Sequence, residues 1–399
     1  MRQNVYVCAM KKILIAVALA MLVILAGIFW QNTSAKSPAQ TFSSCQEKKG
    51  TSLLYAKNFG VDSCGGFRIL WVKNGKSDPL RWLLTDSLSP ASVPLNLKAL
   101  PRISVPAKRI AVLSSTYLGY LNALAAQRRI VAVDTKKYVA DSAFFAWADS
   151  VNLAEVGEGM EISPEALYGL HADVIFSFST GSSIHDAFPK LSKLKMPVLL
   201  TSEWLETSPL AKAEWLKFFG VIVGKESLAD SLFAQSAARY EKIRRELAEI
   251  PAEDKPVVMT GGPVAGLWYA SPGNSFTANL IRDAGGRYLW AADTSTDAFS
   301  MPFEKAFVDG QKATVWLNPG GVSGREELLA RDRRLDHLPV WKTGEIYEYD
   351  LRKGPKGGLD FYESAVVKPD SLLEDVGKRL HPAKFETVPA KWYRKLSNI

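Results

Sequence analysis

The sequence predicts an α/β protein of two lobes, each with a parallel sheet flanked by helices, joined by one long backbone helix, with a cleft between the lobes. From Arg109 onward, short apolar runs alternate with helical stretches, which is typical of parallel sheets wrapped by helices. This alternation occurs twice, and one long helical pattern separates the two occurrences. With 399 residues and 47% apolar content, the chain has enough material for two globular units.

The first lobe is predicted over residues 105–206 and the second over residues 252–399. Short apolar runs between turn signals predict strands in both lobes. In the first lobe these are Ile110–Leu113, Ile130–Val133, Asp173–Phe178 and Val198–Leu200. In the second lobe they are Val257–Thr260, Thr314–Leu317 and Ile346–Tyr349, with helices beginning at Ser275, near Pro302 and near Gly324.

A helical connector is predicted over residues 207–251. Apolar residues recur at steps of three and four from Ser227 to Ile250, at Leu228, Leu232, Tyr240, Ile243 and Leu247. A helix of about 24 residues spans about 36 Å, which is long enough to link two lobes rigidly. A shorter helix precedes it, with Ser208 as N-cap, Pro209 in the first turn and Gly224 as terminator.

The last helix is expected to begin with a capping box. Ser371 and Glu374 have the spacing at which the hydroxyl and the carboxylate each hold a backbone N–H of the first turn. The buried face of this helix is predicted to carry Leu372, Leu373, Val376 and Leu380.

Residues 1–35 predict an export segment. Lys11 and Lys12 precede an apolar run, Ile13–Trp30, and Thr33–Ala35 supply small residues where a signal peptidase cuts. The run is also long enough for an uncleaved membrane anchor, and the sequence leaves both possibilities open. Translation can start at Met1 or at Met10.

Residues 36–104 predict a polar linker followed by an appended β-hairpin. Phe67–Val72 and Leu80–Leu84 have strand character, and Asn74–Lys76 is the turn between them. Cys45 and Cys64 fall in this exported part, where disulfides persist, so a bridge between them is favoured over two free thiols.

Several classes of function are disfavoured by the sequence. The net charge of +8 is spread along the chain without the basic and aromatic patches of a nucleic-acid surface. Gly220–Lys225 is one residue short of a phosphate-binding loop, and Gly320–Gly324 lacks the spacing of a nucleophile elbow. With four histidines, of which His171 and His381 have structural positions, we expect no protein-coordinated metal and no cofactor. The chain is not expected to be an enzyme.

This arrangement resembles the helix-backbone class, class III, of periplasmic substrate-binding proteins of ABC importers, which serves ferric siderophore, haem and vitamin B12 importers. The resemblance covers about residues 105–385, and His171-Ala172 departs from it where the family more often has Lys-Pro. The stretches that carry it are Arg109–Thr116, Leu121–Leu124, Ile130–Val133, Val156–Gly159, Ser163–Leu167, Asp173–Phe176, Gly357–Ser364 and Leu380–Pro382.

The resemblance implies a periplasmic, monomeric binding protein that delivers a bulky metal chelate to an ABC permease and its ATPase. A ferric siderophore is the first candidate ligand, a corrinoid such as vitamin B12 the second and haem the third; any iron or cobalt would arrive already chelated. By the same resemblance, Glu165 and Glu304 are the acids, one in each lobe, that dock onto the permease; helix-start positions also suit acids without such a role. The alternative is a membrane-anchored receptor or sensor domain that uses the same fold without transport.

The ligand cleft is expected where the strands of both lobes end, because ligands of parallel sheets bind outside the carboxyl ends. The loops there are rich in aromatics, glycine and small hydroxyls, which suits a large ligand held by stacking. The alternative interpretation of these aromatic residues is that they pack in the hydrophobic core and do not contact a ligand. The predicted contacts are Ser115, Tyr117, Thr180, Trp204, Trp268, Tyr269 and Arg352.

Overall fold

The computed structural model of the chain describes residues 48–49, 52–86, 92–158, 161–181, 186–295 and 299–397. The predicted export segment and Cys45 lie outside the described residues, so the predictions about them stay predictions. Within these ranges, no helix combines the length and the apolar character needed to cross a membrane.

The first lobe is built on a parallel five-stranded sheet of order β10-β9-β6-β7-β8. Four strands agree with the sequence prediction to within a residue: β6 (Ile110–Val112), β7 (Ile130–Val133), β9 (Val174–Phe178) and β10 (Val198–Thr201). The edge strand β8 (Ala154–Glu155) was not predicted, since two residues leave no recognisable pattern.

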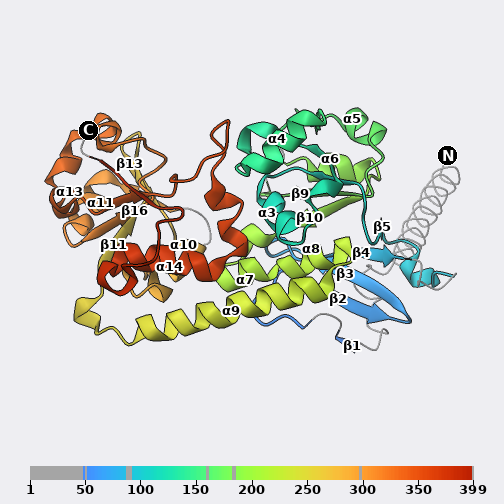
Figure 1. Cartoon of the computed structure of the whole chain (residues 1–399), viewed down its shortest axis with the longest axis horizontal. Coiled ribbons are helices and arrows are strands. Elements are labelled where there is room, and N and C mark those ends of the chain that lie inside the picture. The colour runs from blue at the N-terminus through green and yellow to red at the C-terminus, as the bar shows by residue number, and fades with distance from the viewer. Residues whose placement is uncertain are drawn as a thin grey trace, which may run out of the picture. The chain divides into compact units, whose positions relative to one another are not determined.

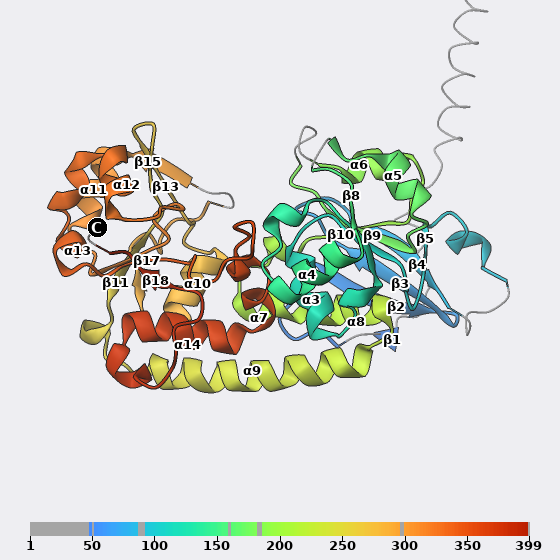
Figure 2. The same ribbon diagram turned by 45° about the horizontal axis from the view of Figure 1, so that its top comes forward.

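Helices cover both faces of this sheet, because successive side chains of a strand point to opposite sides. Ile110 and Val112 pack in one core with α3 (Thr116–Ala123) and α4 (Ser142–Ser150). Ala111 and Leu113 pack in another core with α5 (Pro164–Gly169) and α6 (Phe188–Lys193). Figure 2 shows α3 and α4 together, apart from α5 and α6.

The predicted hairpin is confirmed, but it is not an appendage. Its strands, β3 (Phe67–Val72) and β4 (Leu80–Thr85), lie inside a five-stranded sheet with β1 (Lys48–Lys49), β2 (Phe59–Cys64) and β5 (Arg102–Ser104). This sheet is integrated into the first lobe, because Phe59 and Leu70 share one core with Ile110 and Val112 of β6. The ring of Phe59 also lies 4.7 Å from that of Trp215 in the connector. Cys64 is disulfide-bonded. Since Cys45 is outside the described residues, the pairing of these two cysteines stays a prediction.

The connector consists of α7 (Pro209–Glu214), α8 (Leu216–Val223) and α9 (Glu226–Ala248). The predicted shorter helix is thus two helices that meet at Trp215, whereas its ends are as predicted. Ser208 Oγ accepts a hydrogen bond from the N–H of Ala211 at 3.1 Å, and Gly224 ends α8 in the left-handed conformation with φ 67°.

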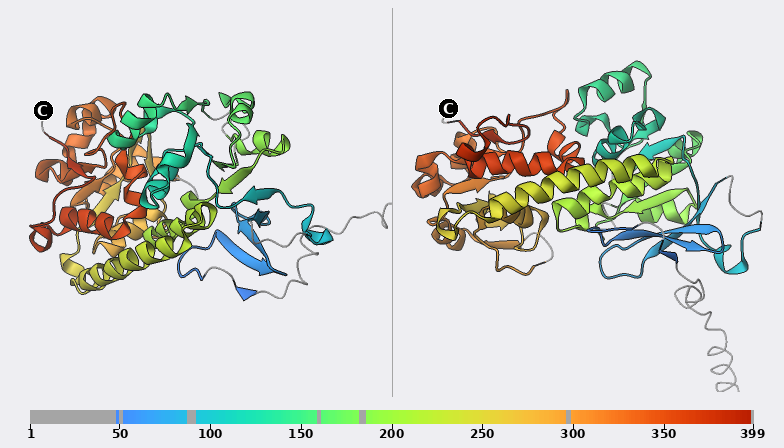
Figure 3. Two further views of the ribbon diagram at one scale, coloured as in Figure 1. Left: turned by 45° about the vertical axis from the view of Figure 1, so that its right-hand side comes forward. Right: turned by 60° about the horizontal axis from the view of Figure 1, so that its bottom comes forward.

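Helix α9 confirms the predicted long backbone helix, and it runs along α8 and α14 (Figures 1 and 3). Its buried residues are Ala229, Phe233, Ala237, Tyr240 and Leu247, whereas Leu228 is 39% exposed. The buried stripe includes Ala229 because the helices approach closely there: a Cβ at Gly220 would lie 2.6 Å from the Cβ of Ala229.

The second lobe contains a sheet of order β14-β11-β16-β17-β18 and a smaller antiparallel sheet of order β12-β13-β15. Strands β11 (Val257–Thr260), β16 (Val315–Leu317) and β17 (Ile346–Glu348) match the predicted runs. The strands that sequence analysis missed are β12 (Gly262–Val264), β13 (Leu267–Ala270), β14 (Arg287–Tyr288), β15 (Phe299–Pro302) and β18 (Arg394–Lys395).

The helices of the second lobe are α10 (Phe276–Asp283), α11 (Phe303–Gly310), α12 (Arg325–Arg331), α13 (Pro339–Thr343) and α14 (Pro369–Leu380). Helices α10, α11 and α12 begin where they were predicted, whereas α13 was not predicted. Ser275 is a true N-cap, since its Oγ accepts a hydrogen bond from the N–H of Ala278 at 3.2 Å. Short 3₁₀ turns complete the described fold: η2 (Leu95–Leu97), η3 (Gln127–Arg129), η4 (Lys136–Tyr138), η6 (Glu203–Leu205), η7 (Ala252–Asp254), η8 (Arg333–His337), η9 (Asp360–Tyr362), η10 (Ala365–Val367) and η11 (Pro382–Phe385).

The predicted capping box of the last helix is wrong. Helix α14 begins at Pro369, two residues before Ser371, and its N-cap Lys368 makes no side-chain cap. Proline is already set for the first turn, so the helix starts there and Glu374 faces Arg239 at 3.4 Å instead. The predicted buried face is confirmed, because Leu372, Leu373, Val376 and Leu380 are all buried.

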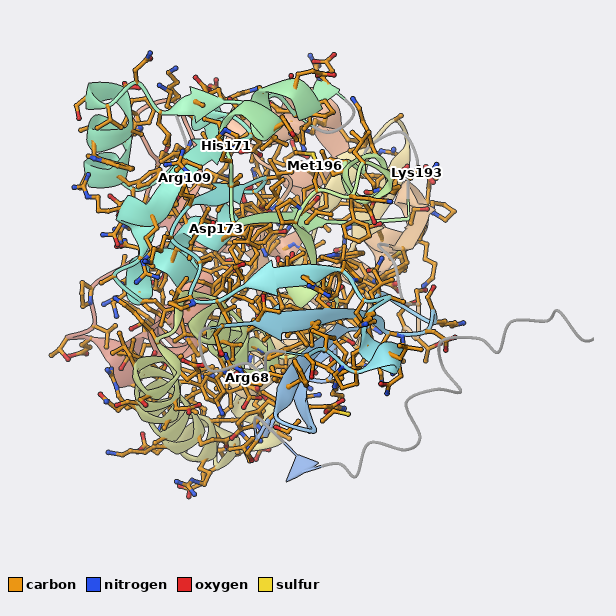
Figure 4. All side chains as sticks on the ribbon, turned by 90° about the vertical axis from the view of Figure 1, so that its right-hand side faces the viewer. Arg68, Arg109, His171, Asp173, Lys193 and Met196 are labelled. Carbon is orange, nitrogen blue, oxygen red and sulfur yellow. The ribbon has the colours of Figure 1, made fainter. Side chains whose placement is uncertain are left out.

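The amino-terminal ends of β6 and β9 are held together by a carboxylate. Asp173 Oδ2 accepts hydrogen bonds from the backbone N–H groups of Lys108, at 2.7 Å, and Arg109, at 2.9 Å. His171 adopts a left-handed conformation with φ 47° in the preceding turn. Figure 4 shows Arg109, His171 and Asp173 near one another at this end of the lobe. Their role is therefore structural, at the edge opposite the carboxyl ends of the strands.

Candidate ligand cleft

A cavity of about 400 Å³ lies where the second-lobe strands end. We call it the aromatic cavity, because five of its residues carry aromatic rings. It is lined by Lys212, Gly261, Tyr269, Ala270, Ser271, Pro272, Phe276, Thr277, Asn318, Tyr349, Phe361, Tyr362, Val366 and Leu372. Gly261, Asn318 and Tyr349 directly follow β11, β16 and β17, so the cavity is at the sheet edge where a ligand was expected.

The rings of the aromatic cavity are held by one another. Tyr349 and Phe361 stack with their centroids 4.6 Å apart, and the hydroxyls of Tyr349 and Tyr362 share a hydrogen bond of 2.7 Å. Tyr362 is 43% exposed and Tyr269 is 44% exposed. The cavity therefore offers fixed and accessible aromatic surface, which suits stacking on a large ligand.

Strand β13 places two predicted contacts on opposite sides, Tyr269 in the cavity and Trp268 in the core, and ligand contact at Tyr269 stays a prediction. Side chains alternate along a strand, so Tyr269 lines the cavity while Trp268 points the other way. Trp268 is fully buried against Trp316, and its Nε1–H donates to the carbonyl of Thr260 at 2.9 Å. The predicted ligand contact at Trp268 is wrong, because this ring belongs to the core of the second lobe.

Tyr117 is likewise a core residue and not a ligand contact. Its ring is fully buried between Phe176 and Phe219, and its hydroxyl shares a 2.5 Å hydrogen bond with that of Thr201. Tyr117 lies in the first turn of α3, which turns its side chain back onto the sheet.

Three predicted contacts follow neighbouring first-lobe strands. Ser115 is the N-cap of α3 after β6, Thr180 follows β9, and Trp204 lies in η6 after β10. Trp204 is 40% exposed, and Thr180 Oγ1 donates to Asp186 at 3.0 Å. They share one sheet edge, as predicted, but none of them lines the aromatic cavity. Their contact with a ligand stays a prediction.

A second cavity, of about 650 Å³, is lined by both lobes and is predominantly polar. We call it the polar cavity. Arg352 lines it and faces Asp360 at 3.3 Å. The residues that line the polar cavity are Gly119, Asn122, Ala123, Ala140, Asp141, Ser142, Ala143, Leu351, Arg352, Lys353, Asp360, Glu363, Ser364, Val367 and Lys368.

Beside the polar cavity, the segment from Arg352 to Ser364, here called the strap, docks on the first lobe. Glu363 is buried, and its carboxylate accepts hydrogen bonds from the N–H groups of Ala140 at 2.8 Å and Asp141 at 3.2 Å. A Cβ at Gly119 would lie 1.9 Å from the carbonyl oxygen of Glu363, so only glycine permits this approach. Gly354 similarly approaches the carbonyl of Val139. Because Phe361 and Tyr362 of the strap also line the aromatic cavity, the strap joins that cavity to the contact between the lobes.

Two groups of opposite charge, the buried Glu203 and the half-buried Lys212, attract each other beside the aromatic cavity. Glu203 of η6 is buried, and burial raises the pKa of its carboxyl group. Lys212 of α7 lines the aromatic cavity, and burial lowers the pKa of its ammonium group while the charge of Glu203 raises it.

The two predicted docking acids lie at the exposed starts of two helices, one in each lobe. Glu165 is in the first turn of α5, where Ser163 Oγ donates to it at 3.3 Å. Glu304 is in the first turn of α11 and pairs with Arg334 at 3.0 Å, an interaction that, after a backbone N–H, helps to lower the pKa of Glu304. Both side chains are exposed, and their docking role stays a prediction.

No group of three or more histidine, cysteine, aspartate or glutamate residues suited to a metal ion occurs in the described part of the chain. The expectation that the protein itself coordinates no metal stays a prediction.

Sequence analysis missed several cavity residues. Phe276 directly follows the predicted cap Ser275, Tyr349 ends a predicted strand, and Tyr362 lies in the loop after that strand. Nothing in the sequence marks which of their side chains face the cavity. Nothing in the sequence indicated that Lys212 lines a cavity, because a lysine on a connector helix is ordinarily solvated.

The comparisons with known proteins agree with this architecture. A family model described as "Periplasmic binding protein" matches residues 110–352. An uncharacterized lipoprotein of Methanocaldococcus jannaschii is 21% identical over 293 residues, which cover 71% of this chain and 67% of the relative.

Among solved structures, a periplasmic binding protein from Veillonella parvula is similar with a TM-score of 0.55 and 13% identity, over 80% of this chain and 99% of that one. A periplasmic heme binding protein from Pseudomonas aeruginosa is similar with a TM-score of 0.54 and 17% identity, over 73% of this chain and 99% of that one. At such identities the structures show the fold alone, which is that of ABC solute-binding proteins. Because the family model covers more than half of the sequence, the chain belongs to the periplasmic binding protein family.

Proposed function

We propose that this protein is the extracytoplasmic substrate-binding protein of an ABC importer and that its cargo is a bulky metal chelate. A ferric siderophore is the first candidate and a corrinoid the second. The observation that carries the proposal is the aromatic cavity at the carboxyl edge of the second-lobe sheet, with the exposed ring of Trp204 at the corresponding edge of the first lobe. Similar solved structures include a heme binding protein and a possible iron-binding protein, which supports this class of cargo.

The proposed mechanism is closure of a clamp. Ligand bridges the two lobes, and α9 limits their opening because a continuous helix of 23 residues resists bending. The closed form then presents Glu165 and Glu304 to arginines of the permease, one acid from each lobe. The metal belongs to the cargo, so the protein needs no cofactor, and it acts as a monomer until it docks.

The first test is calorimetric titration of the full chain, in mild detergent, with a ferric tris-hydroxamate, a ferric tris-catecholate, cyanocobalamin and haem. We expect saturable one-to-one binding of one iron chelate. If folded protein gives no heat with any of the four, the proposal is wrong, and the receptor or sensor alternative gains weight. Tight binding of cyanocobalamin alone would retain the importer and replace the cargo.

Replacing Tyr269 by alanine is expected to weaken binding of that chelate about tenfold. The loss of one stacked ring costs about 0.5–1.5 kcal/mol beyond its buried area, and Tyr269 is a cavity residue with 44% of its surface exposed. Tyr168→Ala is the matched control, because Tyr168 is 74% exposed and outside both cavities. Equal affinities for the two variants would place the ligand elsewhere.

A further inference from the structure

Lys212 has a position that differs from those of the other lysines with little exposure. Lys136 pairs with Asp149 at 2.6 Å, and Lys217 pairs with Glu214 at 3.1 Å. Lys212 lines the aromatic cavity, yet its ammonium group makes neither a hydrogen bond nor an ion pair with any described residue. An ammonium group carries three donors, and none of those of Lys212, which is half-buried, is taken up by a described acceptor.

The charge of Glu203 raises the pKa of the Lys212 ammonium without using its donors. The two groups form no ion pair, and Glu203 Oε2 is buried without a hydrogen-bond partner in the described structure. Their attraction nevertheless opposes the effect of burial, which by itself favours the neutral amine. Lys212 therefore lines the aromatic cavity with an ammonium group whose donors are not used by any described residue.

The surroundings of Lys212 define what it can receive. Its Nζ lies 5.5 Å from the centre of the Phe276 ring, and Phe276 lines the same cavity. A ligand with an anionic oxygen beside a flat ring would pair with the ammonium and stack on Phe276 at once.

We infer that Lys212 is the specificity-determining cation of the cleft, and that the protein selects net anionic chelates over neutral chelates of similar size. The residue acts from the connector between the lobes, so it reaches the ligand whichever lobe moves. The inference rests on the proposed function and narrows its ligand class. The inference also assigns the recognition of ligand charge to Lys212 in the aromatic cavity. Arg352 lines the polar cavity instead, and its guanidinium faces Asp360.

The test compares a net anionic ferric tris-catecholate with a neutral ferric tris-hydroxamate in calorimetric titrations of wild type and Lys212→Met. A hydrogen bond to a charged group contributes about 1.5–3 kcal/mol, so we expect Lys212→Met to lose about 10- to 100-fold in affinity for the anionic chelate. Affinity for the neutral chelate should change less than threefold. Lys212→Arg should retain most of the anion affinity, because it keeps the charge.

Lys312→Met is the matched control for net charge. Lys312 is exposed and precedes β16, so it lies at the opposite edge of the sheet from the cavity, and its replacement should leave both affinities unchanged. If Lys212→Met folds poorly, wild type alone suffices. Its affinity for the anionic chelate should fall as pH rises through the lowered pKa of Lys212, because the ammonium is then lost.

Two outcomes would overturn the inference, and only one of them would also overturn the proposed function. If wild type prefers the neutral chelate, or Lys212→Met binds the anionic chelate like wild type, the inference fails and the proposed function stands. If wild type binds no chelate at all, both fail.

Discussion

Replacing Asp375 by alanine is expected to lower the free energy of unfolding by about 3–5 kcal/mol, the usual cost of removing one partner from a buried charged cluster. The Asp375 side chain is fully buried in α14. One of its oxygens accepts from Arg379 Nη2 at 3.1 Å, and the other accepts from the N–H groups of Trp392 at 2.7 Å and Tyr393 at 3.0 Å. Alanine would leave the buried N–H groups of Trp392 and Tyr393 without this acceptor, and Arg379 without its carboxylate partner.

Glu374→Ala provides the matched control for Asp375→Ala. Glu374 is the preceding residue of α14, but its partners Arg239 and Lys391 are more exposed, so its loss should cost no more than about 1 kcal/mol. The measurement is urea unfolding followed by circular dichroism. If the two variants differ by less than about 1 kcal/mol, the hydrogen bonds of Asp375 do not stabilise the lobe as argued.

The same substitution bears on ligand binding. Asp375 holds the segment that leads into β18, and β18 pairs with β17 at the edge of the second-lobe sheet. Tyr393 in this segment lies 6.5 Å, ring to ring, from Tyr349 of the aromatic cavity. A carboxylate remote from the ligand thus supports a ring that contacts the cavity, so Asp375→Ala is also expected to weaken binding.

The strands and the long helix could be predicted because their signals are local. Val257–Thr260 is a strand buried on both faces, so it reads as a continuous apolar run with ends at the predicted residues. Ser275 is a cap recognisable by residue type alone. By contrast, β5 pairs in parallel with β4 and β18 pairs with β17 across a long stretch of chain, and no local pattern encodes such pairings.

The candidate site could be predicted only as a set of loops. Sequence places Trp268 and Tyr269 together after β12, and only the direction of β13 decides that one ring packs in the core while the other faces the cavity. For Lys212, the deciding fact is the position of its helix between two lobes. For Glu363, it is a contact with Ala140 over a separation of 223 residues. These are properties of tertiary packing and not of residue type.

The stability of the docked strap is expected to fall as pH rises through neutrality, and Glu363 is the group responsible. The pKa of its carboxyl is raised from 4.5 to about 7, mainly by burial and also by the charges of Asp360 and Asp141, while the N–H groups of Ala140 and Asp141 act in the opposite direction. A carboxyl whose pKa is raised on folding binds its proton more tightly in the folded state. Its contribution is therefore most favourable below pH 4.5 and is lost between about pH 4.5 and 7. The shift corresponds to about 3 kcal/mol, at 1.36 kcal/mol for each pKa unit.

Glu363→Gln mimics the protonated carboxyl and should remove this pH dependence. The same cavity is also lined by Asp141, Asp360, Arg352, Lys353 and Lys368, which both proteins retain, so their comparison isolates Glu363. The measurement is urea unfolding of wild type and variant at pH 5 and pH 8, where the variant should gain about 2–3 kcal/mol relative to wild type only at pH 8.

Asp134 supplies the control for the pH dependence, because burial also raises its pKa to about 7 while its neighbouring acids, Glu155 and Glu158, belong to the first lobe. Asp134→Asn should remove a separate part of the pH dependence, additive with that of Glu363→Gln, since the two carboxyls face different groups. A wild type and a Glu363→Gln variant with parallel stabilities from pH 5 to pH 8 would show that the strap does not hold a desolvated carboxylate. The Glu363 contact would then be a hydrated one, and the approach of the lobes would rest on Gly119 and Gly354 alone.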